Sequence, residues 1–294
     1  MKTLEQIISP IAAEMAQFEA YFKQTPKADT EPMDTIMRYV HESKGKRLRP
    51  ILVLLSAKLF GEVNERTFRA ATFVEMVHSA TLIHDDVVDN DNLRRGTASV
   101  KAQFGNLSAV LAGDYLLAKA MLLIVNDSDI LNEMLHTTAA MSEGELMQNA
   151  VGLSHCGSRS HCGSRSHCGS QSHCGSHDDV NQPTRLPWYD SPTDHYLEII
   201  TRKTAMLMRS CCVAGALSVD ALPGQLLQIA DFGFNFGILF QLRDDILDGE
   251  NTETAVALLP TYLTKTLKTL EGVQPSEAIE SLRLLTAFCA ERER

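Results

Sequence analysis

Two copies of one acidic motif, DDxxD, constrain this chain more than any other feature. Residues 85–89 read DDVVD and residues 244–248 read DDILD, and each motif ends a long apolar stretch. In a helix, positions i and i+4 share a face and position i+1 lies beside them. Carboxylates are unfavourable at the C-terminal end of a helix, which carries partial negative charge. One such cluster could be a solvated helix end, whereas two indicate a shared cation.

Oxygen ligands with few other donors suit Mg²⁺, which keeps several waters and binds substrate phosphates through one or two carboxylates. The sequence therefore predicts a magnesium site between the two motifs. Its six candidate ligands are Asp85, Asp86, Asp89, Asp244, Asp245 and Asp248.

The rest of the sequence indicates an all-α fold. Segments rich in Ala, Leu and Met are interrupted by charges, and alternating strand-like runs are scarce. A chain of 294 residues can bury one large core, so we expect a single domain over residues 1–294, built as a helical bundle with its active-site cavity in the centre. The expected helices span residues 4–23, 31–43, 50–60, 67–89, 106–125, 128–149, 191–218, 223–248, 253–270 and 275–291.

Short connections favour helices that alternate in direction. The helices that end near Asp89, Asn149 and Asp248 would then be parallel. We therefore expect both acidic motifs at the same end of the bundle.

A six-residue unit, SHCGSx, is repeated four times over residues 154–177. Gly, Ser and His cannot bury a core, so this insertion is predicted to be disordered in a loop between two helices. Its His-Cys pairs could collect Zn²⁺. The spacing matches no known zinc module, which favours a neutral expansion of a tolerant loop.

The formal net charge of −10 does not favour nucleic acid or anionic lipid as partners. The N-terminus has no signal-peptide pattern, and no stretch approaches the roughly 20 uncharged apolar residues of a membrane span. We expect a cytoplasmic protein with reduced cysteines. Basic residues gather at 44–49, 94–95 and 202–203, which predicts local anion sites.

Five ordered segments resemble the trans-type isoprenyl diphosphate synthases, the polyprenyl synthetase family. They are GKRLRP at 45–50, HSATLIHDDVVDNDNLRRG at 78–96, Gln148 after GEL, Lys203-Thr204-Ala205, and FQLRDDILD at 240–248. The resemblance covers about residues 30–250. It implies the isoprenoid synthase type of helical bundle, a homodimer, and condensation of isopentenyl diphosphate with an allylic diphosphate of the farnesyl or geranylgeranyl type.

In this family the allylic C–O bond ionises, and Mg²⁺ neutralises the diphosphate that leaves. The resemblance implies three ions, with two held by Asp85 and Asp89 and a third held by Asp244. These residues and Lys203 would be the catalytic ones. The allylic diphosphate would be bound by Arg94, Gln148, Lys203, Thr204 and Gln241, and isopentenyl diphosphate by Lys46, Arg49, His78 and Arg95.

The residues before the first motif bear on product length. A growing chain should run along this helix, and short-product relatives carry bulky aromatic residues four and five positions before the motif. Here the corresponding positions are small, which favours an all-trans product of medium or long chain that would be delivered to a membrane. The positions concerned are Val74, Val77, Ala80 and Thr81.

The chain departs from the family after the second motif. The expected loop lysine is absent, the next cation is Lys265, and only 46 residues follow Asp248. A weakly active enzyme or a regulatory subunit of a heteromeric synthase is therefore an alternative, although such subunits generally lose their acidic motifs. A class I terpene cyclase is a further alternative, disfavoured by Lys46, Arg49 and Arg95. A metal-sequestering protein built around the His-Cys tract is the last.

Overall fold

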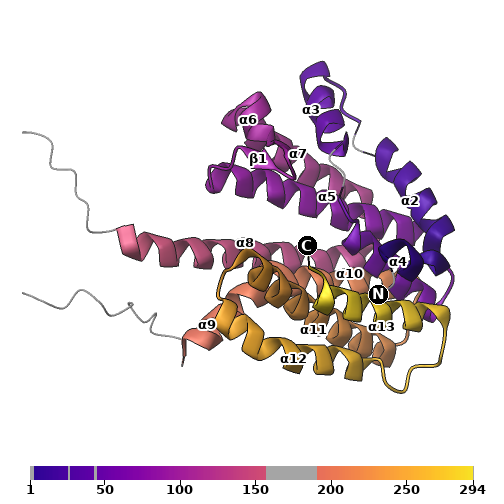
Figure 1. The fold of residues 1–294 in the computed structure, drawn as a ribbon. Coiled ribbons are helices and arrows are strands. Elements are labelled where there is room, and N and C mark those ends of the chain that lie inside the picture. The colour runs from indigo at the N-terminus through magenta and orange to yellow at the C-terminus, as the bar shows by residue number, and fades with distance from the viewer. Residues whose placement is uncertain (1–2, 26, 43–44, 157–190, 294) are drawn as a thin grey trace, which may run out of the picture.

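A computed structural model describes residues 3–25, 27–42, 45–156 and 191–293. The fold is all-α, as predicted, and its helices fill the molecule (Figure 1). The repeat at residues 154–177 was predicted to be disordered. Its first three residues belong to the end of α8, and the others lie outside the described residues. The elements are α1 Leu4–Ile7, the short 3₁₀ helix η1 Ser9–Ile11, α2 Ala12–Gln24, α3 Glu31–Glu42, α4 Leu48–Phe60, α5 Glu65–Val88, β1 Leu93–Arg94, β2 Thr97–Ala98, α6 Val100–Phe104, α7 Asn106–Leu123, α8 Ser128–Cys156, α9 Pro192–Ile200, the π-helix η2 Thr201–Ala205, α10 Met206–Leu217, α11 Pro223–Asp248, α12 Thr252–Thr269 and α13 Glu277–Glu291.

Three predicted helices are divided in the structure or differ from it by more than two residues. The first is broken at Pro10, which lies in the first turn of η1 and lacks the N–H that a helix interior requires. The second, predicted to end at 149, continues as α8 to Cys156. The third, predicted over 191–218, is divided by the π-helix η2.

The core is formed by long central helices. α11 packs against α10 and α12, α4 packs against α10, and α5 packs against α7. Phe232 and Phe236 of α11 are fully buried and stacked at 5.7 Å between ring centroids. The two ends of the chain also meet, because Ser281 Oγ of α13 donates to the carbonyl of Ile7 at 2.7 Å. Since α5 and α11 belong to this rigid core, the motifs at their ends have fixed positions.

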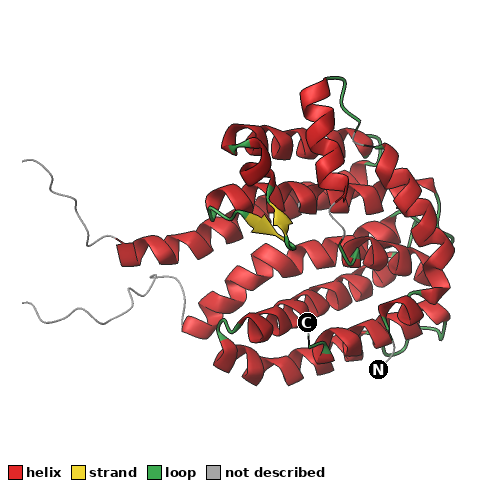
Figure 2. Cartoon of the chain, turned by 45° about the horizontal axis from the view of Figure 1, so that its top comes forward, coloured by secondary structure: helices red, strands yellow, loops and turns green. Residues whose placement is uncertain are grey.

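The described residues contain a single small sheet, in which β1 and β2 form a hairpin directly after the first acidic motif (Figure 2). Its two-residue loop is Arg95-Gly96, and both residues have positive φ, +52° and +80°. Paired positive φ values are typical of the tight turns whose twist matches that of the strands. The sequence did not predict this hairpin, because strands of two residues leave no periodic pattern.

α7 exposes an apolar stripe along one face, which the exposed carboxylate of Asp114 interrupts. Leu107, Leu111 and Leu122 are 75%, 51% and 66% exposed, and they lie on the same side of the helix. By length and hydropathy alone α7 could also cross a membrane. In the fold, 28% of this segment is buried. In this structure α7 packs against α5, and its outer stripe has no partner among the described residues.

Candidate active site

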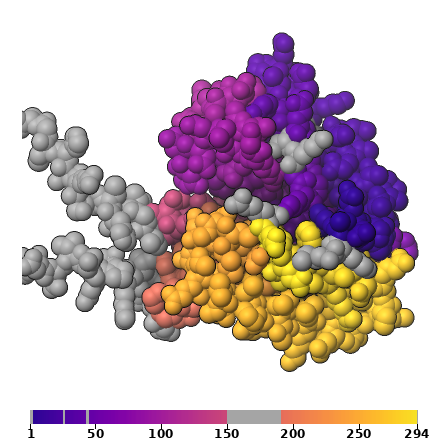
Figure 3. All heavy atoms as spheres, in the orientation of Figure 1, coloured from indigo at the N-terminus to yellow at the C-terminus, as the bar shows by residue number. Residues whose placement is uncertain are grey.

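The two acidic motifs face a common site, as the alternation of helices predicts. Lys203 of η2 interacts electrostatically with Asp85 of α5 and with Asp245 of α11, so it lies between the two motifs. The N-terminal helices, indigo to magenta, and the C-terminal helices, orange to yellow, form two halves that meet along a seam (Figure 3).

Asp85 and Asp89 form the charged face of the first motif. Burial and, after it, the nearby carboxylate of Glu145 raise the pKa of Asp85 to about 6, against the opposing effect of Lys203. The pKa of Asp89 is raised by the same causes. Negative charge is therefore concentrated here beyond what the protein neutralises, which is the setting in which a carboxylate pair takes up a cation.

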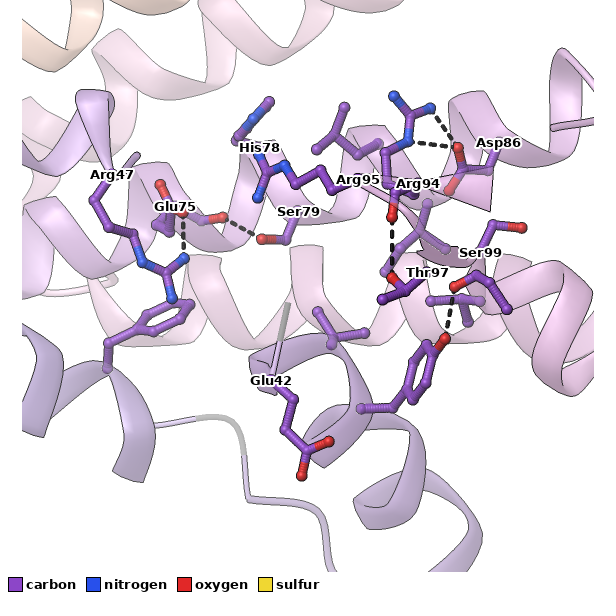
Figure 4. Close-up of a pocket in the computed structure, with 17 residues that line it drawn as sticks. Glu42, Arg47, Glu75, His78, Ser79, Asp86, Arg94, Arg95, Thr97 and Ser99 are labelled. Carbon is purple, nitrogen blue, oxygen red and sulfur yellow. Dashed lines mark hydrogen bonds and ion pairs between the residues drawn. The ribbon is translucent and has the colours of Figure 1, made fainter. Parts of the chain in front are cut away.

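The second aspartate of the first motif has another environment. Asp86 is 3% exposed, and its Oδ1 accepts hydrogen bonds from Nε of Arg94, at 2.8 Å, and from Nη2 of the same guanidinium (Figure 4). The sequence predicted Asp86 as a metal ligand. In the structure its carboxylate orients Arg94, a predicted diphosphate-binding residue.

The second motif repeats this arrangement. Asp245 is 6% exposed and accepts hydrogen bonds from the hydroxyl of Tyr196 and, at 2.7 Å, from Nε2 of Gln241. The Gln241 carbonyl oxygen accepts from Thr204 Oγ1 at 2.8 Å. The predicted ligand Asp245 therefore orients two predicted substrate-binding side chains, Gln241 and Thr204.

Asp244 has a cationic partner that the sequence analysis missed. The guanidinium of Arg292, the third residue from the end of the sequence, pairs with Asp244 and lies 4.3 Å from the centroid of the Phe240 ring. Arg243 anchors this segment by donating to the carbonyl of Arg292. The loop after Asp248 has no cation, and Arg292 brings one to the motif from the end of the chain. The basic residues of the closing ERER sequence were the available signal.

Lys203 is placed by the π-helix η2. A π-turn inserts an extra residue into a helix and changes the direction of its side chains, and such turns often occur at functional sites. Two glycines let neighbouring helices approach it: a Cβ on Gly144 of α8 would lie 2.9 Å from the Lys203 amide nitrogen, and a Cβ on Gly237 of α11 would lie 2.5 Å from the Ala205 Cα. η2 is therefore held between α8 and α11.

The Lys203 ammonium bridges two side chains of α8. Its Nζ lies 2.6 Å from a carboxylate oxygen of Glu145 and donates to the carbonyl oxygen of Gln148 at 3.0 Å. Gln148 was predicted as a site residue, and Glu145 was not. Glu145 stands in the GEL string that precedes Gln148, so the sequence offered a signal that was not used.

A cavity of about 390 Å³ lies between α4, α5 and α13. Four of the residues that line it are the predicted binders of isopentenyl diphosphate, namely Lys46, Arg49, His78 and Arg95. Among the described residues, no carboxylate forms an ion pair with Lys46, Arg49 or Arg95. Nε of Arg49 is buried without a hydrogen-bond partner. Cations that lack internal counter-ions at a cavity wall indicate an anionic ligand.

His78 is neutral in this cavity. Burial first, and then the cations Arg49 and Arg95, hold its pKa well below the ordinary value. A neutral imidazole can donate one hydrogen bond to an anion, and it adds no charge to the cationic wall.

The hairpin turn directs Arg95 into the cavity. The ideal Cβ position on Gly45 lies only 2.5 Å from Arg95 Nη1, so the guanidinium occupies the space that a side chain at residue 45 would need. The GKR segment and the LRRG segment, 45 positions apart in sequence, are thereby brought together.

The four predicted chain-length residues lie on α5 beneath the first motif. Val74, Val77 and Ala80 are buried, and Thr81 is half-buried with its hydroxyl donating to the carbonyl of His78 at 2.9 Å. Their effect on product length stays a prediction.

The described residues contain no group of three or more His, Cys, Asp or Glu side chains close enough to enclose a metal by themselves. The carboxylates that face the site belong to two separate helices, with Asp85 and Asp89 on α5 and Asp244 and Asp248 on α11. Oxygen donors divided in this way suit a hard cation whose coordination is completed by water and substrate oxygens.

Comparisons with known proteins identify the family to which most of the chain is similar. Residues 30–257 match the family model described as polyprenyl synthetase. An all-trans-nonaprenyl-diphosphate synthase (geranyl-diphosphate specific) from Rhodobacter capsulatus is 33% identical over 83% of this chain and 65% of its own length. Heptaprenyl diphosphate synthase component 2 from Geobacillus stearothermophilus is 30% identical over 85% of this chain and 68% of its own.

A solved structure of a polyprenyl synthase from Caulobacter crescentus CB15, complexed with calcium and isoprenyl diphosphate, superposes with a TM-score of 0.79 at 25% identity. The match covers 99% of this chain and 98% of that one. The chain spans about two thirds of the length of the two curated relatives.

Proposed function

The chain belongs to the polyprenyl synthetase family, and we propose that it condenses isopentenyl diphosphate with an allylic diphosphate to give an all-trans polyprenyl diphosphate. One observation carries this proposal: two facing acidic motifs lie beside a cavity in which Lys46, Arg49 and Arg95 form no ion pair with any carboxylate of the described residues. The acidic side suits a diphosphate that arrives with metal ions, and the cationic side suits a diphosphate without them.

The allylic diphosphate binds on the acidic side. Asp85, Asp89, Asp244 and Asp248 would hold Mg²⁺, for which we propose three ions as in the resemblance above. The bound ions would neutralise the charge that develops on diphosphate as the allylic C–O bond breaks. Arg94, Gln148, Lys203, Thr204 and Gln241 orient the same group, and Asp86 and Asp245 hold two of these side chains in place.

Isopentenyl diphosphate binds in the cationic cavity. Lys46, Arg49 and Arg95 neutralise its diphosphate, and neutral His78 donates one hydrogen bond. Its double bond then attacks the allylic cation, and a proton leaves the new chain. The diphosphate released from the allylic substrate is the base, so no protein base is required. A terpene cyclase has no use for such a cavity, which argues against that alternative.

The product is of medium or long chain. Ala80 and Thr81 are small side chains beneath the first motif, at positions where an aromatic side chain would form a floor. The names of the relatives, nonaprenyl and heptaprenyl synthases, support this length. Ala80→Phe should shorten the product, and an unchanged product distribution would show that this position does not set its length.

We propose a homodimer that associates through the apolar stripe of α7. An exposed apolar surface of this kind is typical of protein interfaces. One relative is a component of a heteromeric enzyme, so a different subunit is the competing partner. This chain keeps both acidic motifs, which favours an active subunit in either assembly.

Two variants test the division of the site. Asp85→Asn should lower kcat by about 10²-fold or more, because it removes a ligand needed to neutralise the leaving group.

Arg49→Gln should raise KM for isopentenyl diphosphate by about 10-fold and leave KM for the allylic substrate within about 2-fold, because one charge-assisted hydrogen bond is lost. Equal effects of Arg49→Gln on both substrates would contradict the assignment of the two sides.

A further inference from the structure

We propose that Arg47 is a positioning residue: through Glu75, it fixes the loop and the first turn of α4, which present Lys46 and Arg49 to the isopentenyl diphosphate cavity. The inference rests on the proposed function of that cavity. It concerns the arginine of the GKRLRP segment to which no substrate role is assigned. Arg47 and Glu75 both line the cavity, and the inference gives this pair a positioning role in its wall instead of a role in binding substrate.

The side chain of Arg47 is engaged in contacts with other residues of the protein. Its Nη1 donates to Glu75 Oε1 at 2.5 Å (Figure 4). Its Nε donates to Glu19 Oε1 at 3.0 Å, and its guanidinium lies 4.9 Å from the centroid of the Phe22 ring. The side chains of Arg47 and Glu75 are only 13% and 5% exposed. An arginine held by two carboxylates and a ring has little capacity left for a third anion.

Arg49, unlike Arg47, has a buried guanidinium nitrogen without a hydrogen-bond partner among the described residues. It lies two residues further along, and the nitrogen concerned is Nε. The two arginines of GKRLRP therefore have separate tasks. Arg49 is available to a diphosphate, whereas Arg47 is committed to Glu75 and Glu19.

The backbone shows why the loop needs such an anchor. Arg47 is the residue before α4, and its φ of +52° and ψ of +34° place it in the left-handed region, which is unfavourable for a residue with a side chain. Its side chain makes no capping bond to the helix. Tertiary contacts must therefore hold this conformation, and the contacts present are those to Glu75, Glu19 and Phe22.

The same anchor links the loop to the first acidic motif. Glu75 lies on α5 one turn before His78, which lines the cavity, and ten residues before Asp85. Burial disfavours the charged form of Arg47, but Glu75 and Glu19 outweigh it, so the pKa of Arg47 stays above its ordinary value. The ion pair sets the loop against the helix that carries His78.

The test uses three variants of the full chain. Glu75→Gln keeps the size of the side chain and removes its charge. Arg47→Lys keeps the charge and removes the planar fork that reaches two carboxylates. Glu14→Gln is the matched control, because the Glu14–Lys58 pair also ties α2 to α4 but lies away from the cavity.

The first measurement is calorimetric titration with inorganic diphosphate in the absence of divalent cations, which isolates the cationic cavity. Wild-type protein should bind, Glu75→Gln and Arg47→Lys should bind at least tenfold more weakly, and Glu14→Gln should remain within twofold. Because no turnover is required, this result is independent of whether the chain elongates prenyl substrates.

The second measurement is steady-state kinetics. The same two variants should raise KM for isopentenyl diphosphate at least tenfold and change KM for the allylic substrate less than twofold. Wild-type affinity for diphosphate in Glu75→Gln, or equal losses in Glu14→Gln, would overturn the proposal. A purely structural role would weaken both substrates alike.

A double variant covers the case in which the single variants do not fold. Arg47→Met with Glu75→Leu replaces the buried pair by apolar side chains, an exchange that proteins often tolerate. It should fold and still bind diphosphate at least tenfold more weakly than wild type. Wild-type affinity in the folded double variant would show that the pair does not position the cavity.

Discussion

At the scale of single residues, each acidic motif contains side chains with two different roles. The first and last aspartates face the site, and among them Asp244 also pairs with Arg292. The middle ones, Asp86 and Asp245, are buried and bonded to Arg94 and Gln241. The two DDxxD motifs predicted the position of the site. They did not predict which aspartates would face it and which would bond to neighbouring side chains. Spacing places carboxylates on a helix face, but only neighbouring elements decide which of them acquires a protein partner.

Arg95 combines strain with function, and this leads to a prediction. The left-handed conformation costs a residue with a side chain about 1–2 kcal/mol, and asparagine tolerates it better. Arg95→Asn should therefore raise the free energy of unfolding by about 0.5–1 kcal/mol in urea denaturation, and it should weaken isopentenyl diphosphate binding at least 10-fold. A variant less stable than wild type would show that the guanidinium stabilises the turn.

His41 gives a pH-dependent prediction. It packs edge-on against Phe22 at 4.7 Å between ring centroids, and both of its ring nitrogens are buried without a partner in the described part of the chain. Burial, aided by Arg47, holds its pKa below the ordinary value of 6.5. The unfolded chain therefore binds the proton first as pH falls, so the folded state loses stability below about pH 6.5.

His41→Phe removes this contribution. The free energy of unfolding of wild type minus that of His41→Phe should be constant above about pH 7. It should fall below about pH 6.5, by at most about 1.4 kcal/mol per pH unit. Denaturation at pH 5, 6, 7 and 8 gives this difference directly, and a pH-independent difference would mean that His41 is protonated equally in both states.

At the scale of elements, the site depends on irregular segments that the sequence does not reveal. The long helices follow from apolar patterning and were predicted within a few residues. The π-helix η2 and the two-residue strands are set by packing against α8, α11 and α5, which local patterns do not encode. These segments carry Lys203 and direct Arg94 and Arg95, so the residues of the site could be predicted and their mutual placement could not.

Gly144→Ala tests the role of η2. The new Cβ would lie 2.8 Å from Arg202 Cβ and 2.9 Å from the Lys203 amide, so α8 and η2 must separate. We expect a loss of about 1–3 kcal/mol in stability and a loss of about 10–100-fold in kcat/KM, because Lys203 is misplaced.

Gly224→Ala is the matched control, since a Cβ there meets nothing within 4 Å. It should leave both quantities near wild type. Normal kcat/KM in Gly144→Ala would show that the position of η2 tolerates this shift.

At the scale of the whole molecule, the site forms where the two halves of the chain meet. The first motif lies in one half and the second in the other, and Arg292 closes the second motif from the last residues of the chain. The absence of a basic loop after Asp248 predicted an incomplete second motif. The structure changes that view, because it brings a cation to Asp244 from a residue 48 positions away in sequence.

The assembly gives a prediction at the same scale. If copies associate through α7, a charge in the middle of its apolar stripe should separate them. Leu111→Glu should convert a dimer into a monomer in sedimentation velocity, and its monomer should retain helical circular dichroism because Leu111 is 51% exposed. An unchanged dimer would place the interface on another face.

The most direct test of the central claim is an elongation assay on the purified full-length protein. The protein is incubated with Mg²⁺, labelled isopentenyl diphosphate and geranyl, farnesyl or geranylgeranyl diphosphate, and the products are separated by chain length. The account predicts condensation with at least one starter to all-trans products of C25 or longer, and none after chelation of Mg²⁺ or in Asp85→Asn. No condensation with any of the three starters would contradict it.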